Sequence, residues 1–178
     1  MPVAKWLSDK VGRIAWIDGW MKVTAKWNPM LILFIIFLLN MGFGLSNRPW
    51  FHHSLLSLDL VAILSAVLGR FLNHPISHWI SRKRPFEEQY MRSLLDHDPG
   101  ESFPSNHATG AFALVIPFIF VPGYALVLLV LAILLAFSRI YCGLHYVSDV
   151  WAGALTGMGL SFIGLFVLSL LPSTTIMQ

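Results

Sequence analysis

Long apolar stretches alternate with short polar ones along this chain of 178 residues. At the rise of an α-helix, about 20 apolar residues cross the ~30 Å core of a bilayer. The pattern therefore predicts an all-α integral membrane protein, a bundle of about five transmembrane helices. The expected spans are 29–45, 54–81, 105–121, 123–141 and 146–171.

The first 28 residues follow a different pattern, in which aromatic and aliphatic side chains are interleaved with five lysines and arginines. Such a segment is too charged to span a bilayer, so we expect an interfacial amphipathic helix that is broken near Asp18 and Gly19. The chain is thereby divided into an interfacial segment, 1–28, and a membrane domain, 29–178. The loop 86–103 carries five acidic residues and is expected to form a lid or rim outside the bilayer.

The composition supports a membrane protein and excludes several other classes. Hydrophobic residues make up 56% of the chain and charged residues 12%, against about 25% charged in soluble domains. There is no nucleic-acid motif, and the seven tryptophans suit anchoring at a membrane interface. A single cysteine allows no internal disulfide and no cysteine-based metal site. The sequence does not give the oligomeric state.

Polar residues form a stripe along the second span at three- and four-residue spacing. They are Arg70, Asn73, His74, Ser77 and Ser81. In lipid such a stripe must face protein or water. It is either a polar seam between helices or the wall of a wet cavity leading to Arg84, with Arg70, Asn73 and Ser77 as the candidate lining.

Small residues form a second stripe, on the last span. Gly153, Gly157, Ser161 and Gly164 recur on one side of that helix. Small side chains let helix backbones approach closely in membranes, so this stripe predicts helix packing rather than chemistry.

Chemically competent residues gather where the predicted spans begin and end. Arg84 follows the second span, the segment FPSNHATG at 103–110 opens the third, Arg139 ends the fourth and His145 precedes the fifth. A chain that crosses the membrane alternately places all of these residues on one face. We therefore expect them to converge.

The convergent set suits phosphoryl transfer. Two arginines supply planar forks for phosphate oxygens. Ser105 is placed to cap the third span, whose first backbone N–H groups would point at the same anion. His107 and His145 can divide nucleophilic and acid–base roles. No carboxylates cluster as metal ligands, which predicts chemistry without a metal.

Asp149 completes the set. It follows His145 by four residues and so shares its face of a helix, where a carboxylate can fix the tautomer of the imidazole.

These residues match motifs of a known family, the type 2 phosphatidic acid phosphatases, which are relatives of the vanadium haloperoxidases. Ser138-Arg139, five residues, His145, three residues and Asp149 match the family motif S-R-x5-H-x3-D completely. The segment 104–107, PSNH, resembles the motif P-S-G-H, with Asn106 in place of glycine. Arg84-Pro85 resembles the end of K-x6-R-P, but Ser77 stands at the lysine position.

The resemblance implies a role for each matching residue. His145 would be the nucleophile that forms a phosphohistidine, Asp149 its orienting partner and His107 the acid that protonates the leaving group. The phosphoryl oxygens would be held by Arg84, Arg139 and Ser105, with the backbone N–H groups of Asn106 and His107. Such enzymes use no metal and no other cofactor.

The departures from the motifs resemble a subfamily, the bacterial undecaprenyl pyrophosphate phosphatases of the bacitracin-resistance type. Asn106 is expected to preserve the turn made by the family glycine, because asparagine tolerates a left-handed backbone. Ser77 in place of lysine, and Asn73, fit the same type. The resemblance thus implies hydrolysis of undecaprenyl diphosphate to the monophosphate, in the recycling of the lipid carrier for cell-wall synthesis.

Two other functions remain open at this point. One is a phosphatidylglycerophosphate or phosphatidate phosphatase of the same fold. The other is a membrane transporter or channel, in which Arg70 and Asp59 would lie on the pathway.

The membrane orientation is predicted differently by two arguments. An odd number of spans puts the basic segment 1–28 on the catalytic side, which the positive-inside rule assigns to the cytoplasm. The resemblance implies the outer face of the cell membrane, where the spent lipid carrier is released. We expect the outer face, because an interfacial helix held by anionic headgroups weakens the charge rule.

Overall fold

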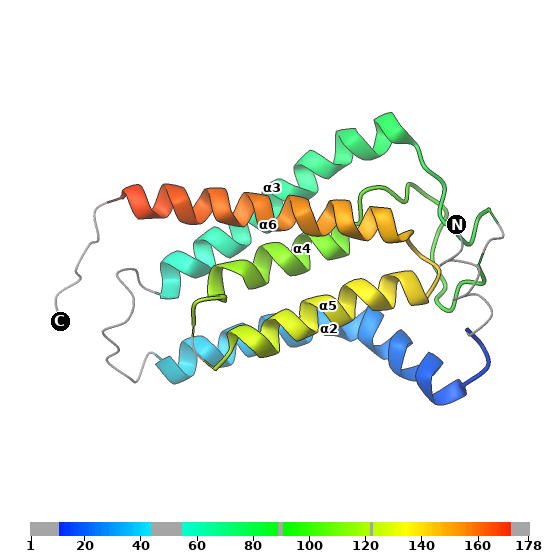
Figure 1. Ribbon diagram of the computed structural model, residues 1–178, viewed down its shortest axis with the longest axis horizontal. Helices are drawn as coiled ribbons and strands as arrows, with labels where there is room; N and C mark the ends of the chain where they lie inside the picture. Colours follow the sequence, from blue (N-terminus) through cyan, green and yellow to red (C-terminus); the bar gives the residue numbers. More distant parts are fainter. Residues whose placement is uncertain (1–10, 44–54, 89–90, 122, 172–178) are drawn as a thin grey trace.

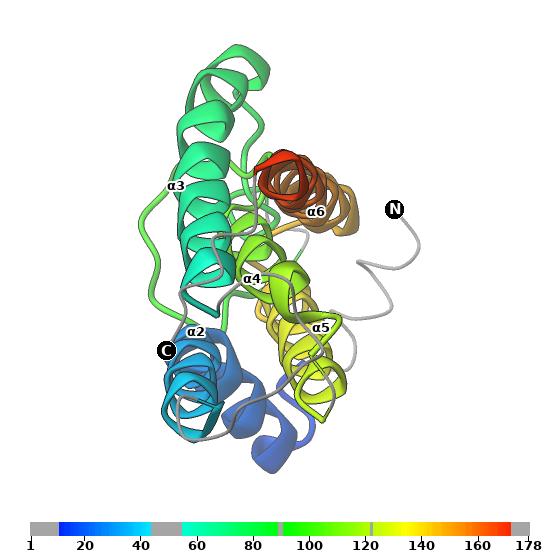
Figure 2. The ribbon, with the colours of Figure 1, turned by 90° about the vertical axis from the view of Figure 1, so that its left-hand side faces the viewer.

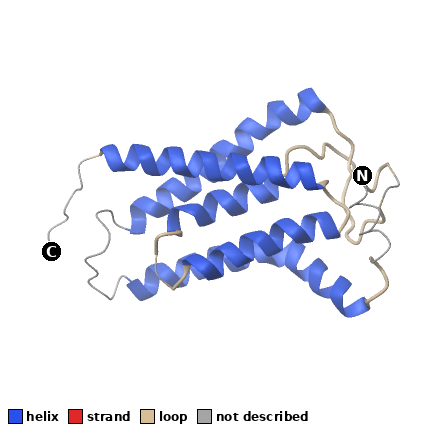
Figure 3. Cartoon of the chain, in the orientation of Figure 1, coloured by secondary structure: helices blue, strands red, loops and turns tan. Residues whose placement is uncertain are grey.

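Five α-helices and one 3-10 helix form the described part of the chain, which is residues 11–43, 55–88, 91–121 and 123–171 of a computed structural model. They are α2 (Ala15–Phe43), α3 (Leu55–Ile80), α4 (Asn106–Val115), η1 (Ile116–Phe118), α5 (Ala125–Tyr141) and α6 (Val147–Leu170). No strand occurs among these residues (Figure 3). The predicted all-α class is confirmed.

The helices run back and forth along the long axis of the molecule (Figure 1). The beginnings of α2, α4 and α6 lie at the same end as the last turns of α3 and α5. The alternation expected from the sequence is therefore present. It brings the segment 81–105 and the segment 142–146 to one end of the bundle.

Helix α2 is longer than predicted. It continues without interruption from Ala15, so the expected break near Asp18 and Gly19 was wrong. Asp18 instead lies in the first turn, where a carboxylate favours the positive helix end, and it accepts hydrogen bonds from the backbone N–H of Gly12 (3.0 Å) and the hydroxyl of Tyr141 (2.8 Å). Pro29 lies inside α2, and its missing N–H accounts for the bend seen in Figure 1.

The first apolar span consequently begins earlier than position 29. The stretch of α2 that is long and apolar enough to cross a membrane is Ala15–Gly42. The boundary that we placed between residues 28 and 29 falls within one helix, and the interfacial position of segment 1–28 stays a prediction.

Helix α4 is shorter than the span expected at 105–121. It ends at Val115, and the chain tightens into η1, where Pro117 has no N–H to continue an α-helix. Short as it is, α4 lies centrally and contacts α2, α3, α5 and α6 (Figure 2). Its burial explains the apolar sequence that resembled a membrane span.

Three described helices are long and apolar enough to cross a membrane: α2 over Ala15–Gly42, α3 and α6; α5 is a shorter apolar helix. Large apolar side chains on their outer faces are exposed, for example Phe37 (55%), Leu64 (63%) and Phe166 (64%). Exposed apolar surface on this scale is expected where lipid replaces water as the solvent. A multi-pass membrane protein is thus confirmed.

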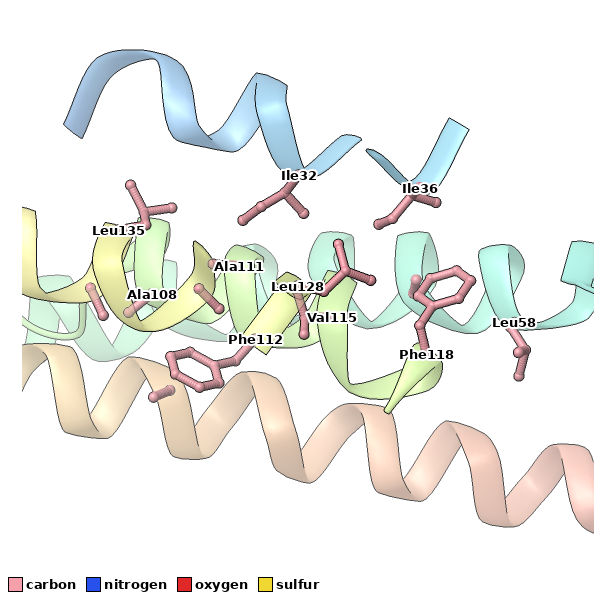
Figure 4. Close-up of a cluster of buried hydrophobic side chains, with 14 of the residues drawn as sticks. Ile32, Ile36, Leu58, Ala108, Ala111, Phe112, Val115, Phe118, Leu128 and Leu135 are labelled. Atoms are coloured by element: carbon pink, nitrogen blue, oxygen red, sulfur yellow. The ribbon is translucent and has the colours of Figure 1, made fainter. Parts of the chain in front are cut away.

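The interior is built around α4. Its Ala111 and Val115 pack with Ile32 and Ile36 of α2 and with Leu128 of α5, all of them buried (Figure 4). These contacts hold α4 in the centre of the bundle and therefore fix the position of its first turn.

The small-residue stripe of α6 packs as predicted. A Cβ atom on Gly153 would lie 2.4 Å from the carbonyl oxygen of Ser105, and one on Gly157 would lie 2.3 Å from that of Thr109. The hydroxyl of Ser161 donates to the carbonyl oxygen of Ala113 at 2.9 Å. Glycine and serine therefore bring the backbones of α6 and α4 into direct contact.

Candidate active site

His145 lies in the tight turn between α5 and α6. The backbone N–H groups of Leu144 and His145 both donate to the carbonyl oxygen of Arg139, at 3.1 and 3.3 Å. Gly143 adopts φ +74°, a left-handed conformation that glycine tolerates well. The turn folds the His145 side chain inward, so that only 4% of the residue is exposed.

One ring nitrogen of His145 has a backbone partner. Nδ1 lies 2.7 Å from the carbonyl oxygen of Ser102, in the segment that leads to α4. A carbonyl oxygen can only accept, so Nδ1 carries the proton and Nε2 is the unprotonated nitrogen. The ring is therefore in the tautomer that can act as a nucleophile through Nε2.

The surroundings of His145 keep its ring neutral. Burial lowers the pKa of His145 well below its ordinary value, and the positive charges of Arg139 and Arg84, with a smaller contribution from His107, act in the same direction. The hydrogen bond to Ser102 opposes this shift. Three of the other predicted residues, Arg84, His107 and Arg139, are thus close enough to affect the pKa of His145.

Asp149 was expected to bond the imidazole of His145, but its carboxylate has other partners. Its fully buried carboxylate accepts hydrogen bonds from Arg82 Nη1 (2.8 Å), the backbone N–H of Tyr146 (2.8 Å) and the hydroxyl of Ser102. No hydrogen bond joins Asp149 to His145 within the described segments. Asp149 is the third residue of α6, and its carboxylate turns back onto the start of that helix.

Two arginines carry buried N–H groups that have no hydrogen-bond partner among the described residues. These are Nε and Nη1 of Arg84 and Nε of Arg139, which is 3% exposed. Burial lowers the pKa of Arg84, while Glu87, Asp149 and Glu101 act against that shift. A guanidinium nevertheless stays charged in proteins, and an unsatisfied buried donor is costly. These groups are suited to an anion.

The start of α4 provides further donors. Ser105 is the N-cap, as predicted: its hydroxyl accepts from the N–H of Ala108 at 3.5 Å, and its own N–H donates to the carbonyl oxygen of Asp149 at 2.9 Å. The N–H groups of the first helical residues, Asn106 and His107, have no partner within the helix. Such N–H groups and the helix dipole favour an anion.

Asn106 does not play the backbone role that we expected. Ser81 is the one non-glycine residue with positive φ among those described, so Asn106 is not left-handed. As the first residue of α4 it needs no left-handed backbone, and its side-chain oxygen accepts from Asn73 Nδ2 at 2.9 Å. Asn73 Nδ2 also donates to Thr109 at 2.9 Å.

The polar stripe of α3 serves both of the purposes left open by the sequence. Asn73 is fully buried against α4 and belongs to a polar seam, the first of the two alternatives, and it is not among the residues that line the two cavities described next. Arg70 and Ser77 do line a cavity that also contains Arg84, as predicted.

Two cavities adjoin the start of α4. The first, about 340 Å³, is polar, and its wall includes His97, Asp98 and Glu101 from the acidic loop. That loop therefore forms a rim, as expected. The second, about 220 Å³, lies between α2, α4 and α5 and is bordered by His107 and several apolar residues. Arg70 and Asn106 border both cavities.

Two residues near His145 were missed by the sequence reasoning. Ser102 supplies the carbonyl that bonds the His145 ring, and its N–H donates to the carbonyl oxygen of Arg82 at 2.7 Å. Arg82 bonds Asp149, and its guanidinium stacks on the ring of Tyr146, 3.8 Å from the centroid. Arg82 lies two residues before Arg84 in the sequence, but its spacing from the motif residues indicated no role in the site. Ser102 bonds the His145 ring through its backbone carbonyl, and a backbone contact leaves no pattern in a sequence.

Comparison with known proteins identifies relatives of this chain. The family model of the PAP2 superfamily matches residues 55–171. The undecaprenyl-diphosphatase BcrC of Bacillus subtilis is 33% identical over 107 residues, which are 58% of this chain and 54% of that protein. An undecaprenyl-diphosphatase of Sulfolobus acidocaldarius is 28% identical over 178 residues, which are 93% of this chain and 78% of that protein.

A solved structure shares the fold. It is a transmembrane PAP2 type phosphatidylglycerolphosphate phosphatase from Bacillus subtilis, with a TM-score of 0.68 and 23% identity, over 96% of this chain and 87% of that one. The chain spans about half the length of curated relatives such as BcrC.

Proposed function

Because the chain belongs to the PAP2 superfamily, we propose that it is a membrane lipid phosphatase that hydrolyses undecaprenyl diphosphate to the monophosphate. One observation carries the proposal. The neutral His145, with its Nδ1 proton held by Ser102, is grouped with two arginines whose buried N–H donors have no partner in the described part of the chain. A nucleophile beside an anion-binding group is what phosphoryl transfer requires.

The reaction would run through a phosphohistidine. His145 Nε2 attacks the terminal phosphorus, an N–P bond forms, and the P–O bond to the lipid phosphate breaks with its electron pair on the bridging oxygen. His107 protonates that oxygen. His107 then takes a proton from water, which attacks the phosphohistidine and releases inorganic phosphate and the free imidazole.

The remaining residues would hold charge. Arg84, Arg139 and the N–H groups at the start of α4 bind the phosphoryl oxygens, on which negative charge is spread in the transition state. Nδ1–H of His145 stays bonded to Ser102 throughout, so the imidazole keeps its orientation while Nε2 carries the phosphoryl group.

A diphosphate substrate is favoured by two features. A departing phosphate monoester is a better leaving group than a lipid alkoxide, so it relies less on His107. Ser77 stands where many family members have a lysine, and that position borders the polar cavity. The positive charge that this lysine would contribute to binding a monophosphate is therefore missing. The BcrC and Sulfolobus relatives are both undecaprenyl-diphosphatases.

A phosphatidylglycerophosphate phosphatase is the second candidate, because the structural neighbour from Bacillus subtilis is named for that activity. The test is phosphate release by purified protein in detergent from undecaprenyl diphosphate, phosphatidylglycerophosphate and phosphatidate. We expect the highest kcat/KM for the diphosphate. A higher value for either glycerolipid would replace the proposed substrate, and release without any gradient distinguishes an enzyme from a transporter.

The covalent step has its own test. His145→Ala should abolish turnover, and wild-type protein should take up an acid-labile label from substrate labelled at the terminal phosphorus. Full turnover by His145→Ala would exclude the phosphohistidine.

We place the active site on the outer face of the cell membrane, where the products of wall synthesis are released. The start of α2 and the start of α6 lie at one end of the bundle, and the end of α6 lies at the other (Figure 1). A reporter fused after Gln178 should therefore read as cytoplasmic. A reporter on the outer side would reverse the orientation.

A further inference from the structure

Arg70 is an unpaired cation in the middle of a membrane-length helix. It makes no hydrogen bond or ion pair with any described residue. It lies ten residues before Ile80, the end of α3, which is about 15 Å of helix. That distance is too great for its side chain to reach the helix end. A charge at such a position marks a site or pathway rather than an anchor.

The surroundings of Arg70 differ on its two sides. On one side lies the polar cavity, with Arg84 and Ser77 in its wall. On the other side lies the smaller cavity, where Ile32, Ala111 and Leu135 form an apolar lining from three helices (Figure 4). Arg70 therefore stands where a charged headgroup would meet an apolar chain.

We infer that Arg70 forms a second anion subsite, which holds the lipid-linked phosphate of a diphosphate. This inference rests on the proposed function and makes it more specific. The terminal phosphate binds at Arg84 and Arg139, the second phosphate lies at Arg70, and the first units of the lipid chain enter the apolar cavity. Asn106, which borders both cavities, lies beside the junction.

This placement explains why the chemical step would be faster for a lipid diphosphate than for a lipid monophosphate. When the bond between the two phosphates breaks, negative charge develops on the departing lipid phosphate, and a nearby guanidinium stabilises that charge. Hydrolysis of a lipid monophosphate releases the lipid as an alcohol, so its leaving group places no phosphate oxygens at Arg70. The subsite thus accelerates cleavage of diphosphates alone.

The test compares undecaprenyl diphosphate with undecaprenyl monophosphate for Arg70→Gln in detergent. Lys83→Gln is the matched control, because it also removes one positive charge but borders neither cavity. We expect Arg70→Gln to lose about 10- to 100-fold in kcat/KM on the diphosphate, as for a hydrogen bond to a charged group, and less than about 3-fold on the monophosphate. Arg70→Lys should recover part of the loss, and Lys83→Gln should change neither value.

Equal losses on both substrates, or no loss on the diphosphate, would overturn the subsite. Retained monophosphate turnover shows that the variant is folded. Failure of the proposed function looks different, because wild-type protein would then turn over a glycerolipid phosphate with a higher kcat/KM than undecaprenyl diphosphate, or His145→Ala would remain active.

Discussion

The carbonyl oxygen of Ser102 lies 2.7 Å from Nδ1 of His145, while the hydroxyl of the same serine donates to Asp149. Its N–H bonds the carbonyl oxygen of Arg82, whose side chain also reaches Asp149. One serine thus joins the residues just after α3, the entry to α4 and the start of α6. Asp149 is therefore linked to the imidazole through Ser102, and no hydrogen bond joins the two directly among the described residues.

We expect Ser102→Ala and Asp149→Asn to lower kcat by about 10- to 100-fold, the scale of a charge-assisted hydrogen bond, with little change in KM. Both substitutions loosen the carbonyl that orients His145, and neither touches the phosphate. Because they weaken one linkage, the double variant should lose less than the product of the two single losses.

Ser93→Ala is the control for that series, since Ser93 lies in the same loop but bonds Leu95. The measurement is steady-state kinetics on wild type, the two single variants, the double variant and the Ser93→Ala control. Independent, multiplying losses would mean that Asp149 and Ser102 act on His145 separately.

The lowered pKa of His145 predicts a pH-dependent stability. In the unfolded chain this histidine takes up a proton near pH 6.5, whereas burial beside Arg139, Arg84 and His107 opposes protonation in the folded state. The unfolded state therefore binds more protons below pH 6.5, so stability is present above that pH and falls as the pH drops through it. The fall is at most about 1.4 kcal/mol per pH unit for one group.

The measurement is the thermal midpoint in detergent between pH 8 and 5. His145→Asn, which cannot titrate, should show a shallower decline than wild type. Identical slopes for the two proteins would mean that folding does not lower the pKa of His145.

Chelators should leave activity largely intact. Among the described residues, no group of three or more His, Cys, Asp or Glu side chains is placed to hold a metal ion. The positive charge around the phosphate would come from Arg84 and Arg139 instead. We expect turnover in EDTA to match turnover without it, and vanadate, which can mimic a five-coordinate phosphoryl group, to inhibit. Loss of activity in EDTA that one divalent ion restores would contradict this prediction.

The sequence predicted most helices and the convergence of the charged residues, because both follow from patterns of residue type. Expected spans at 54–81, 123–141 and 146–171 correspond closely to α3, α5 and α6. The break in α2 was wrong because Asp18 and Gly19 were judged by local propensity, whereas a tertiary bond to Tyr141 holds that turn helical.

The misjudged contacts of the site have a common cause. Asn106 pairs with Asn73 from another helix, and His145 bonds a backbone carbonyl 43 residues away. Spacing along one helix indicates which side chains share a face, but it carries no information about partners on other segments. Asp149 was assigned to His145 on its spacing and on the matching motif, and neither shows the competing partners Arg82 and Ser102, which lie outside that helix.

Close packing of α6 on α4 gives the last prediction, Gly157→Ala. The added Cβ would lie 2.3 Å from the carbonyl oxygen of Thr109 and 2.9 Å from the backbone N of Ala113. Backbone atoms within a helix cannot move aside as a flexible side chain would, so the two helices must separate. Separation would also pull the start of α6 from Ser105, whose N–H bonds the carbonyl oxygen of Asp149.

Gly159→Ala is the matched control on the same helix, because nothing lies within 4 Å of its added Cβ. Helix propensity alone would make either substitution stabilising by up to about 1 kcal/mol. We therefore expect Gly159→Ala to retain activity with an equal or higher thermal midpoint, and Gly157→Ala to lower both, since overpacking typically costs about 1–3 kcal/mol. If Gly157→Ala matched Gly159→Ala in midpoint and turnover, the contact between α6 and α4 would not position the catalytic groups.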